Sequence, residues 1–372
     1  MAMFIVKPWY KKTEPDLPIY GATWDGSSSP VWTRTDAAAN FADPVPYYSG
    51  MSDTPSSPFD NILPWSGMQK VTYSIVGELV EIPKFYYKWT RNGSAMSLQI
   101  SMQQHTGFLC SPAHADRGDS VGERDYVYVG RYHCASDYKS KTGVAPIANI
   151  TRADARTGIH NLGNYIWQND FALFWTIRML YLVEFANWNS QSLIGYGCGN
   201  NSSVENSGST DTMPYHTGTI KTSRTTYGVG IQYRYIEDLW ANVRDWCDGV
   251  YFSSADVYCI NNPANFSDST GGTKVGQRAT TDGWSKAWNN PAVSGFEYAL
   301  YPSSADSNLD GSTYITDYCD YNSSGVVLFA DGYYYQTPGS GAFCLSGNRS
   351  ASGYDAFIGT RLMVLPPSRL TN

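Results

Sequence analysis

The sequence is poor in charged residues and has no cluster of one sign. Lysine, arginine, aspartate and glutamate make up only 16% of its 372 residues, against about a quarter in average proteins. The net charge is -7 at pH 7, and the 26 basic residues are dispersed along the chain. A nucleic-acid surface needs basic residues gathered on one face. We therefore expect neither nucleic acid nor an anionic membrane surface as a partner.

Long apolar runs are also missing. The longest, residues 171 to 186, contains Arg178 and Glu184 and is shorter than the roughly 20 residues of a membrane-spanning helix. The apolar residues after Met1 are too few for a signal-peptide core and lack both a preceding basic residue and a cleavage site. These absences predict no membrane insertion, and synthesis in the bacterial cytoplasm without a signal peptide.

Paired metal-binding or redox residues are absent as well. The seven cysteines are scattered, without a Cys-x-x-Cys pair or a Cys/His ligand spacing. Neither a zinc site nor a disulfide framework is indicated, and we expect buried thiols that behave as small apolar groups. The histidines show no paired spacing, and no Gly-x-Ser-x-Gly elbow marks a serine nucleophile.

What the sequence does contain is aromatic area. Aromatic residues make up 15% of it, and 29 of them are tyrosines, enough for a large core with some left for the surface. Residues 1–65 are rich in turn-forming Pro, Ser, Asp and Thr, yet also contain four tryptophans. We predict an extended N-terminal arm over residues 1–65, for attachment or oligomerisation. It would pack on the main domain, residues 66–372, on a second copy or on a larger assembly.

Strand patterns dominate the main domain. A hairpin turn is expected at residues 91–94, and the predicted strands are residues 82–89, 95–101, 125–132, 296–301, 326–330 and 356–365. Thr151 is a plausible N-cap of a helix that ends near Gly163, and Asp170 could cap a helix over residues 171–186. The second helix is apolar nearly all round, which places it at the centre. The predicted fold class is α+β, with two helices, short antiparallel strands and long ordered loops.

Several short segments resemble known families in the right order. Residues 235–248, Tyr-Ile-Glu-Asp-Leu-Trp-Ala-Asn-Val-Arg-Asp-Trp-Cys-Asp, resemble the Glu-x-Leu-x-Gly-Asn-Val-x-Glu-Trp element of the formylglycine-generating (sulfatase-modifying) family. Residues 332–335, 341–343 and 358–362 are similar to the closing elements of variable proteins that retroelements diversify in phages and bacteria. These families share a C-type-lectin-like fold, so the resemblance implies that fold here.

The N-terminal segments look like a different set of proteins. Residues 24–35, 57–65 and 82–86 resemble phage and prophage tail-associated proteins. The resemblance thus covers most of the chain from about Tyr20 and implies a place in a virion tail.

The sequence differs from the formylglycine-generating enzymes at the positions that the resemblance implies are catalytic. The resemblance implies that catalysis needs a pair of cysteines after a Gly-Gly-Ser-Tyr-like strand, for copper-assisted thiolate oxidation. Here residues 332–341 contain no thiol, and Cys344 stands alone beyond them. Ala241 also replaces the usual Gly before Asn242. We therefore expect no enzymatic activity of this kind and no cofactor.

A stretch rich in tyrosine, serine and glycine, residues 331–357, is the predicted display segment. Tyrosine offers much contact area at low entropic cost, and Ser, Gly and Asn supply adaptable hydrogen bonds, as in paratopes. Ordinary strand and loop residues of an aromatic-rich protein would have the same composition. The residues expected to face outward and bind ligand are Asp331, Tyr333, Tyr335, Ser340, Asn348, Arg349, Ser350, Tyr354, Asp355 and Phe357.

The composition of this segment also fits diversification by a retroelement. Mutating the adenines of Asn codons of the AAY form never gives Lys, Glu, Met, Trp or Gln. From residue 331 to 357 only Gln336 belongs to that set. A short, weakly charged loop could lack these residues by chance.

Residues 306–317 fit most of a calcium-loop pattern of the Asp-x-Asn-x-Asp-Gly type. Hard oxygen ligands at alternate positions with a Gly at the bend are what such a loop needs. However, Thr313 stands where an aliphatic residue is usual, no flanking helices are evident, and Asx-turns produce the same letters. No cofactor is the first expectation, with calcium as the alternative, and the ligands would be Asp306, Asn308, Asp310 and Asp317.

Together these patterns favour a non-catalytic receptor-binding protein of a phage or prophage tail. The expected partners are a host cell-surface protein or glycan and other tail proteins, with a homotrimer suggested by analogy to tail fibres. A diverged formylglycine-generating-like or glycan-cleaving enzyme is one alternative. A structural baseplate or decoration protein is another.

Overall fold

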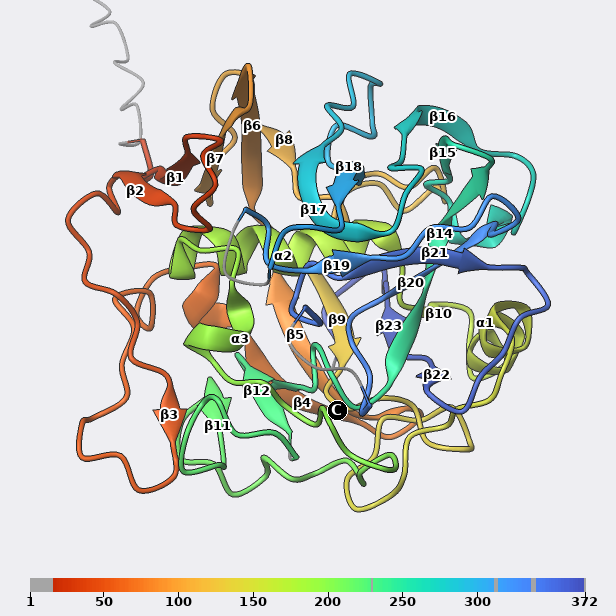
Figure 1. The fold of residues 1–372 in the computed structure, drawn as a ribbon, viewed down its shortest axis with the longest axis horizontal. Coiled ribbons are helices and arrows are strands. Elements are labelled where there is room, and N and C mark those ends of the chain that lie inside the picture. Colours follow the sequence, from red (N-terminus) through yellow and green to blue (C-terminus); the bar gives the residue numbers. More distant parts are fainter. Residues whose placement is uncertain (1–15, 229, 311–313, 336–338, 371–372) are drawn as a thin grey trace, which may run out of the picture.

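The computed structural model describes residues 16–228, 230–310, 314–335 and 339–370. Within these ranges the chain forms mainly β-strands with three α-helices (Figure 1). This content fits an α+β or a mainly-β class. The helices are α1 (Arg152–His160), α2 (Phe171–Phe185) and α3 (Ser190–Leu193), with 3-10 turns η1 (Trp65–Gly67) and η2 (Pro263–Asn265).

Two five-stranded sheets are built mainly from the first half of the chain. In the first the strand order is β2 (Thr33–Asp36), β1 (Tyr20–Trp24), β7 (Ala95–Ser101), β6 (Tyr86–Asn92) and β8 (Leu109–Cys110). In the second the order is β10 (Ile166–Gln168), β23 (Leu362–Val364), β9 (Tyr126–Gly130), β5 (Gly77–Pro83) and β4 (Gln69–Tyr73). Because β23 pairs with β9, the end of the chain closes onto its first half.

Three further sheets hold most of the second half. One has the order β13 (Ile236–Glu237), β12 (Ile231–Tyr233), β11 (Gly218–Thr219) and β3 (Tyr47–Tyr48). The next contains β16 (Thr273–Gln277), β15 (Asp256–Cys259), β14 (Arg244–Ser253), β20 (Val327–Ala330) and β21 (Leu345–Arg349), with β22 (Ile358–Gly359) beside β14. The last contains β18 (Pro302–Asp306), β17 (Gly283–Trp288) and β19 (Tyr318–Cys319).

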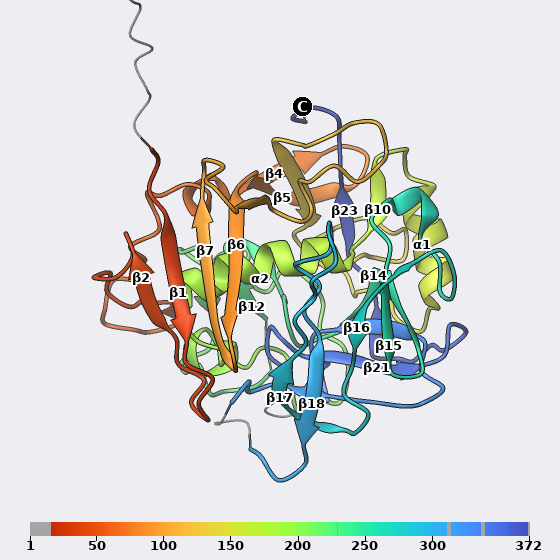
Figure 2. The ribbon, with the colours of Figure 1, turned by 90° about the horizontal axis from the view of Figure 1, so that it is seen from above.

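Helix α2 is the centre of the molecule, as its sequence predicts. Asp170 caps it by accepting a hydrogen bond from the backbone N–H of Leu173, and all 15 residues are buried. The helix ends where Ala186 takes a left-handed conformation. Figure 2 shows α2 between strands β4 and β5 on one side and β17, β18 and β21 on the other.

The described part of the predicted N-terminal arm packs on the rest of the chain. Strand β1 pairs with β7 along its whole length. Trp24 and Trp32 join the main hydrophobic core, and the fully buried Trp65 donates a hydrogen bond from its indole to the Leu180 carbonyl. Residues 1–15 lie outside the described residues, so the predicted attachment role stays a prediction.

Other local predictions have mixed outcomes. Thr151 caps α1 as expected, and β6 and β7 form the predicted hairpin with Gly93 in a left-handed conformation. The predicted strand at residues 82–89 is instead divided between β5 and β6, and residues 356–365 are divided between β22 and β23. Residues 296–301 form turns rather than a strand.

Candidate functional site

The display segment begins at a buried ion pair. Asp331 follows β20 with a left-handed backbone (φ 72°) and is 2% exposed. Its carboxylate pairs with the guanidinium of Arg178 in α2, which also donates to the Ala342 carbonyl at 2.8 Å. Burial raises the pKa of Asp331 to about 7, against the opposing effect of Arg178. The prediction that Asp331 faces outward is wrong, because its side chain fastens the segment to the central helix.

A second set of contacts holds residues 339–343. The carboxylate of Asp317 accepts hydrogen bonds from the backbone N–H groups of Gly341 and Phe343, both at 2.7 Å. Helix α3 adds two acceptors, Gln191 Oε1 for the Gly339 N–H (3.1 Å) and Ser190 Oγ for the Ala342 N–H (2.9 Å). Within this stretch Ser340 is only 1% exposed, so its predicted outward position is also wrong.

Between and beyond these anchors, the other predicted residues lie wholly or partly at the surface. Tyr335 is 69% and Tyr354 61% exposed. Ser350 is exposed too, and the partly exposed ones are Tyr333, Asn348, Arg349, Asp355 and Phe357. The structure therefore places eight of the ten predicted residues where a ligand could reach them.

Aromatic and charged side chains order this surface. The rings of Tyr333 and Phe357 stack with centroids 4.2 Å apart, and the Arg244 guanidinium lies 4.7 Å from the Tyr333 centroid. Arg349 forms an ion pair of 3.1 Å with Asp355. Residues 333 and 357 are thus joined in space although 24 positions separate them in the sequence. Sequence reasoning did not identify Arg244 as a residue of this site. The one indication in the sequence was that Arg244 lies in residues 235–248, the segment that resembles the formylglycine-generating family.

Residues 235–248, which resemble the formylglycine-generating family and are called the family-like element below, form backbone contacts with the display segment. The Asn242 carbonyl accepts a hydrogen bond from the Tyr334 N–H at 2.9 Å, and its side chain accepts from the Glu205 N–H at 3.0 Å. The Asn201 N–H in turn donates to the Tyr334 carbonyl at 2.6 Å. The loop around Asn201 and Glu205 therefore lies beside the display segment, which the sequence did not indicate.

Carboxylates of this element are structural hydrogen-bond acceptors. Glu237 accepts hydrogen bonds from the Gly208 and Thr210 backbone N–H groups at 2.6 and 2.8 Å. Asp245 contacts His133 at 2.9 Å and Arg361 at 3.1 Å, and both its oxygens are buried. Burial and the neighbouring Glu237 raise the pKa of Asp238 to about 8. These groups hold the backbone together inside the molecule.

The predicted calcium ligands do not come together as a set in the described residues. Asp317 is buried and directs both oxygens to residues 341 and 343, so it is an anchor rather than an outward ligand. Asp306 accepts a hydrogen bond from the Asn308 N–H at 2.9 Å. Residues 311–313 of the loop lie outside the described residues. In the described ranges, no group of three or more His, Cys, Asp or Glu could hold a metal ion.

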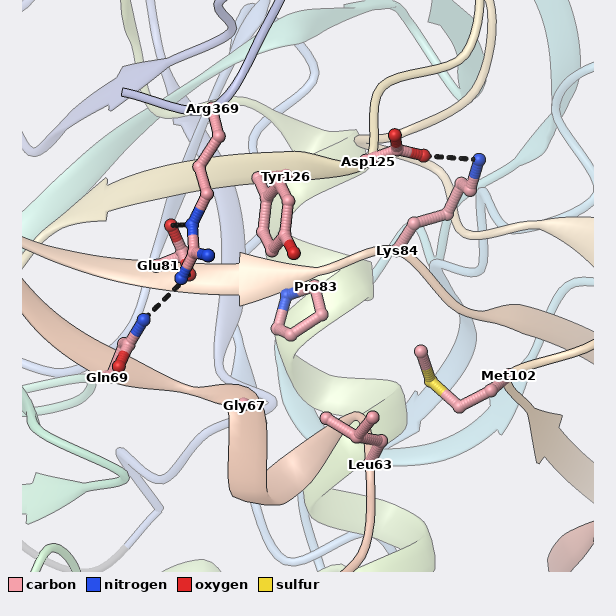
Figure 3. Close-up of a pocket in the computed structure, with 10 residues that line it drawn as sticks. All are labelled: Leu63, Gly67, Gln69, Glu81, Pro83, Lys84, Met102, Asp125, Tyr126 and Arg369. Atoms are coloured by element: carbon pink, nitrogen blue, oxygen red, sulfur yellow. Dashed lines mark hydrogen bonds and ion pairs between the residues drawn. The ribbon is translucent and has the colours of Figure 1, made fainter. Parts of the chain in front are cut away.

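A cleft of about 410 Å³ opens on another part of the surface (Figure 3). Arg369 pairs with Glu81 at 2.7 Å, and Lys84 pairs with Asp125 at 2.8 Å, so the charges of the cleft neutralise one another. Figure 2 places β4, β5 and the C-terminus on the side of α2 away from β21. The cleft is therefore separate from the display segment.

Comparison with known proteins gives no assignment. No family model matches the chain, and no curated protein matches it. In the part of the chain that the structure describes, no helix is long and apolar enough to cross a membrane.

Proposed function

We propose that the chain is a non-catalytic receptor-binding protein that recognises a host cell-surface protein or glycan through the exposed part of residues 333–357. Its proposed setting is a phage or prophage tail, its proposed fold the C-type-lectin-like one, with diversification by a retroelement. The observation that carries the proposal is a segment with buried anchors and exposed tyrosines. Asp331 and residues 339–343 are fastened to the core, whereas Tyr335 and Tyr354 project from it.

Such an arrangement suits recognition because the entropy of ordering the segment is lost during folding and not during binding. A surface that is already ordered loses less entropy on binding. Tyrosine contributes a large, stiff contact area. The ring of Tyr333 stacks on Phe357 and also lies against the guanidinium of Arg244. Variation of the exposed residues would leave the buried anchors untouched.

The state of Cys344 supports a binding role over the thiol chemistry of the related enzymes. Its side chain is buried, and burial raises its pKa well above the ordinary range for a thiol. A reactive cysteine needs an accessible thiolate at neutral pH. The alternative of a thiolate oxidase therefore finds no support at this position.

The proposal is tested with the double variant Tyr335→Ala/Tyr354→Ala. Truncating two exposed tyrosines at a binding surface should weaken binding of the labelled protein to a panel of bacterial cells by about tenfold or more. The melting temperature should stay unchanged, because both side chains are mostly in solvent.

The matched control is Tyr165→Ala, which removes a 44% exposed tyrosine between α1 and β10. It should leave cell binding intact. Equal binding by the double variant and the wild-type chain, to cells that the wild type recognises, would contradict the proposal.

A further inference from the structure

A cavity of about 410 Å³ lies beside α3 and is lined by an arginine, Arg224, whose side chain donates no hydrogen bond to a described residue. Its volume falls in the range of small-molecule sites, about 300–1,000 Å³, and exceeds what a single inorganic ion would fill. Its wall consists of Tyr48, Ser192, Thr222, Ser223, Arg224 and Thr225.

Arg224 differs from the other buried or half-buried arginines of the chain. Arg234 pairs with Glu184, Arg361 with Asp245, and Arg178 with Asp331. No described residue accepts a hydrogen bond from Arg224, and its Nε is shielded from solvent. A guanidinium that donates no hydrogen bond within the described residues keeps its donors for a ligand. Because Nε is shielded, an oxyanion in the cavity would be bound by the two Nη groups of Arg224.

The rest of the wall is suited to a hydroxylated ligand. The guanidinium of Arg224 lies 5.4 Å from the ring centroid of Tyr48, which limits its orientations. The hydroxyls of Ser223 and Thr225 contact each other at 3.0 Å, and each keeps capacity for another hydrogen bond. The cavity thus combines the guanidinium of Arg224, several hydroxyl groups and the ring of Tyr48 in one polar site.

The cavity and the display segment share the short helix α3. Ser190 and Gln191 accept hydrogen bonds from residues 342 and 339, and the next residue, Ser192, lines the cavity. The Arg224 carbonyl also accepts a hydrogen bond from the Tyr196 N–H at 2.9 Å, just beyond α3. Helix α3 therefore joins the wall of the cavity to the buried anchor of the display segment.

We propose that this cavity is a subsite for an acidic saccharide, with Arg224 binding the carboxylate and the surrounding hydroxyls binding the sugar. The assignment deepens the proposed function, on which it rests for the idea that the ligand belongs to a host surface. The cleft of Figure 3 offers no such group, because its arginine and lysine are already paired.

Ligand-observed NMR titration of the full chain tests the subsite, with sodium glucuronate, glucose and acetate at constant ionic strength. Glucuronate should bind at least about tenfold more tightly than glucose or acetate, because charge-assisted hydrogen bonds and sugar contacts act together. Arg224→Gln should weaken glucuronate binding at least about tenfold, and Arg224→Lys should keep only part of it, since lysine lacks the planar fork.

The control variant Lys274→Gln removes one positive charge from an exposed lysine on β16 and should bind glucuronate like the wild type. Equal affinity of wild type and Arg224→Gln overturns the subsite. Acetate binding as tightly as glucuronate overturns its assignment to a saccharide. Cell binding by the wild type is measured in parallel. Glucuronate binding without cell binding overturns the proposed function alone, and the reverse result overturns the subsite alone.

Discussion

At the scale of single residues, the ion pair between Arg178 and Asp331 anchors the start of the display segment in the core. Both side chains are almost fully buried, at 1% and 2% exposure. Removing one partner of such a pair leaves an uncompensated charge in the interior. Arg178→Met should therefore lower the free energy of unfolding by about 3–5 kcal/mol, measured by urea denaturation.

A suitable comparison is Lys141→Met, which breaks an ion pair with Asp137 whose side chains are both more than 40% exposed. Exposed pairs add little because water and salt screen them. If both variants lost stability equally, the buried pair would not be the anchor inferred here.

Another single residue, Asp238, makes the free energy of unfolding depend on pH. Its folded-state pKa is about 8, raised mainly by burial from the ordinary value of 3.8. The folded chain then holds a proton that the unfolded chain releases, so this contribution to stability falls as pH rises towards 8. The slope is about 1.4 kcal/mol per pH unit for one such proton. We expect the free energy of unfolding to decrease from pH 6.5 to 8.

That window lies above the ordinary histidine pKa of 6.5, where burial lowers the pKa of both His114 and His133. These two groups therefore contribute little to the slope there. Burial also raises the pKa of Asp317 and of Asp331 to about 7, so these two groups add to the decrease mainly at the lower end of the window. Asp238→Asn cannot ionise and should flatten the decrease in urea-denaturation measurements chiefly between pH 7 and 8. An unchanged slope in this variant would show that Asp238 is not the group responsible.

At the scale of elements, the sequence predicts features that depend on neighbouring residues in the chain, such as helix caps, a hairpin turn and a buried helix. Asp170 and Thr151 were identifiable as helix caps because a cap bonds to a backbone N–H three residues away. The β6–β7 hairpin was identifiable because its turn contains Gly93, which takes a left-handed conformation at no steric cost. The buried character of α2 followed from apolar residues on all its faces.

Features that depend on distant partners were not predictable in this way. Asp331 and Ser340 looked like surface residues because polar side chains in a Gly/Ser-rich stretch usually are exposed. They are buried because Arg178, 153 positions away, and Asp317 hold that stretch inward. Helix α3 has four residues and no periodic pattern. That the Arg224 side chain donates no hydrogen bond to a described residue is evident only from the folded chain.

At the scale of the whole molecule, β21 of the display segment and the two ends of the described part of the chain lie on different sides of α2. Figure 2 shows the C-terminus and the point where the described chain begins on the far side of α2 from β21. This separation suits a protein that is attached at one side and recognises a ligand at the other.

The described part of residues 1–65 also contributes to the stability of the whole molecule. Strand β1 lies between β2 and β7, and Trp65 is fully buried against α2. Deleting residues 1–65 would leave β7 unpaired on one side and open the main core, at a cost of several kcal/mol from lost aromatic burial alone. We expect this truncation to lose cooperative thermal unfolding and its near-ultraviolet circular dichroism.

Deleting only residues 1–15 keeps every contact between described residues in place, so this truncation serves as the control. The pair of truncations separates two descriptions of the N-terminal region. If the chain that starts at residue 66 unfolds cooperatively, residues 16–65 are an arm separable from the main domain. If it does not, the single core that Trp24, Trp32 and Trp65 form with α2 makes residues 16–65 part of the main domain itself.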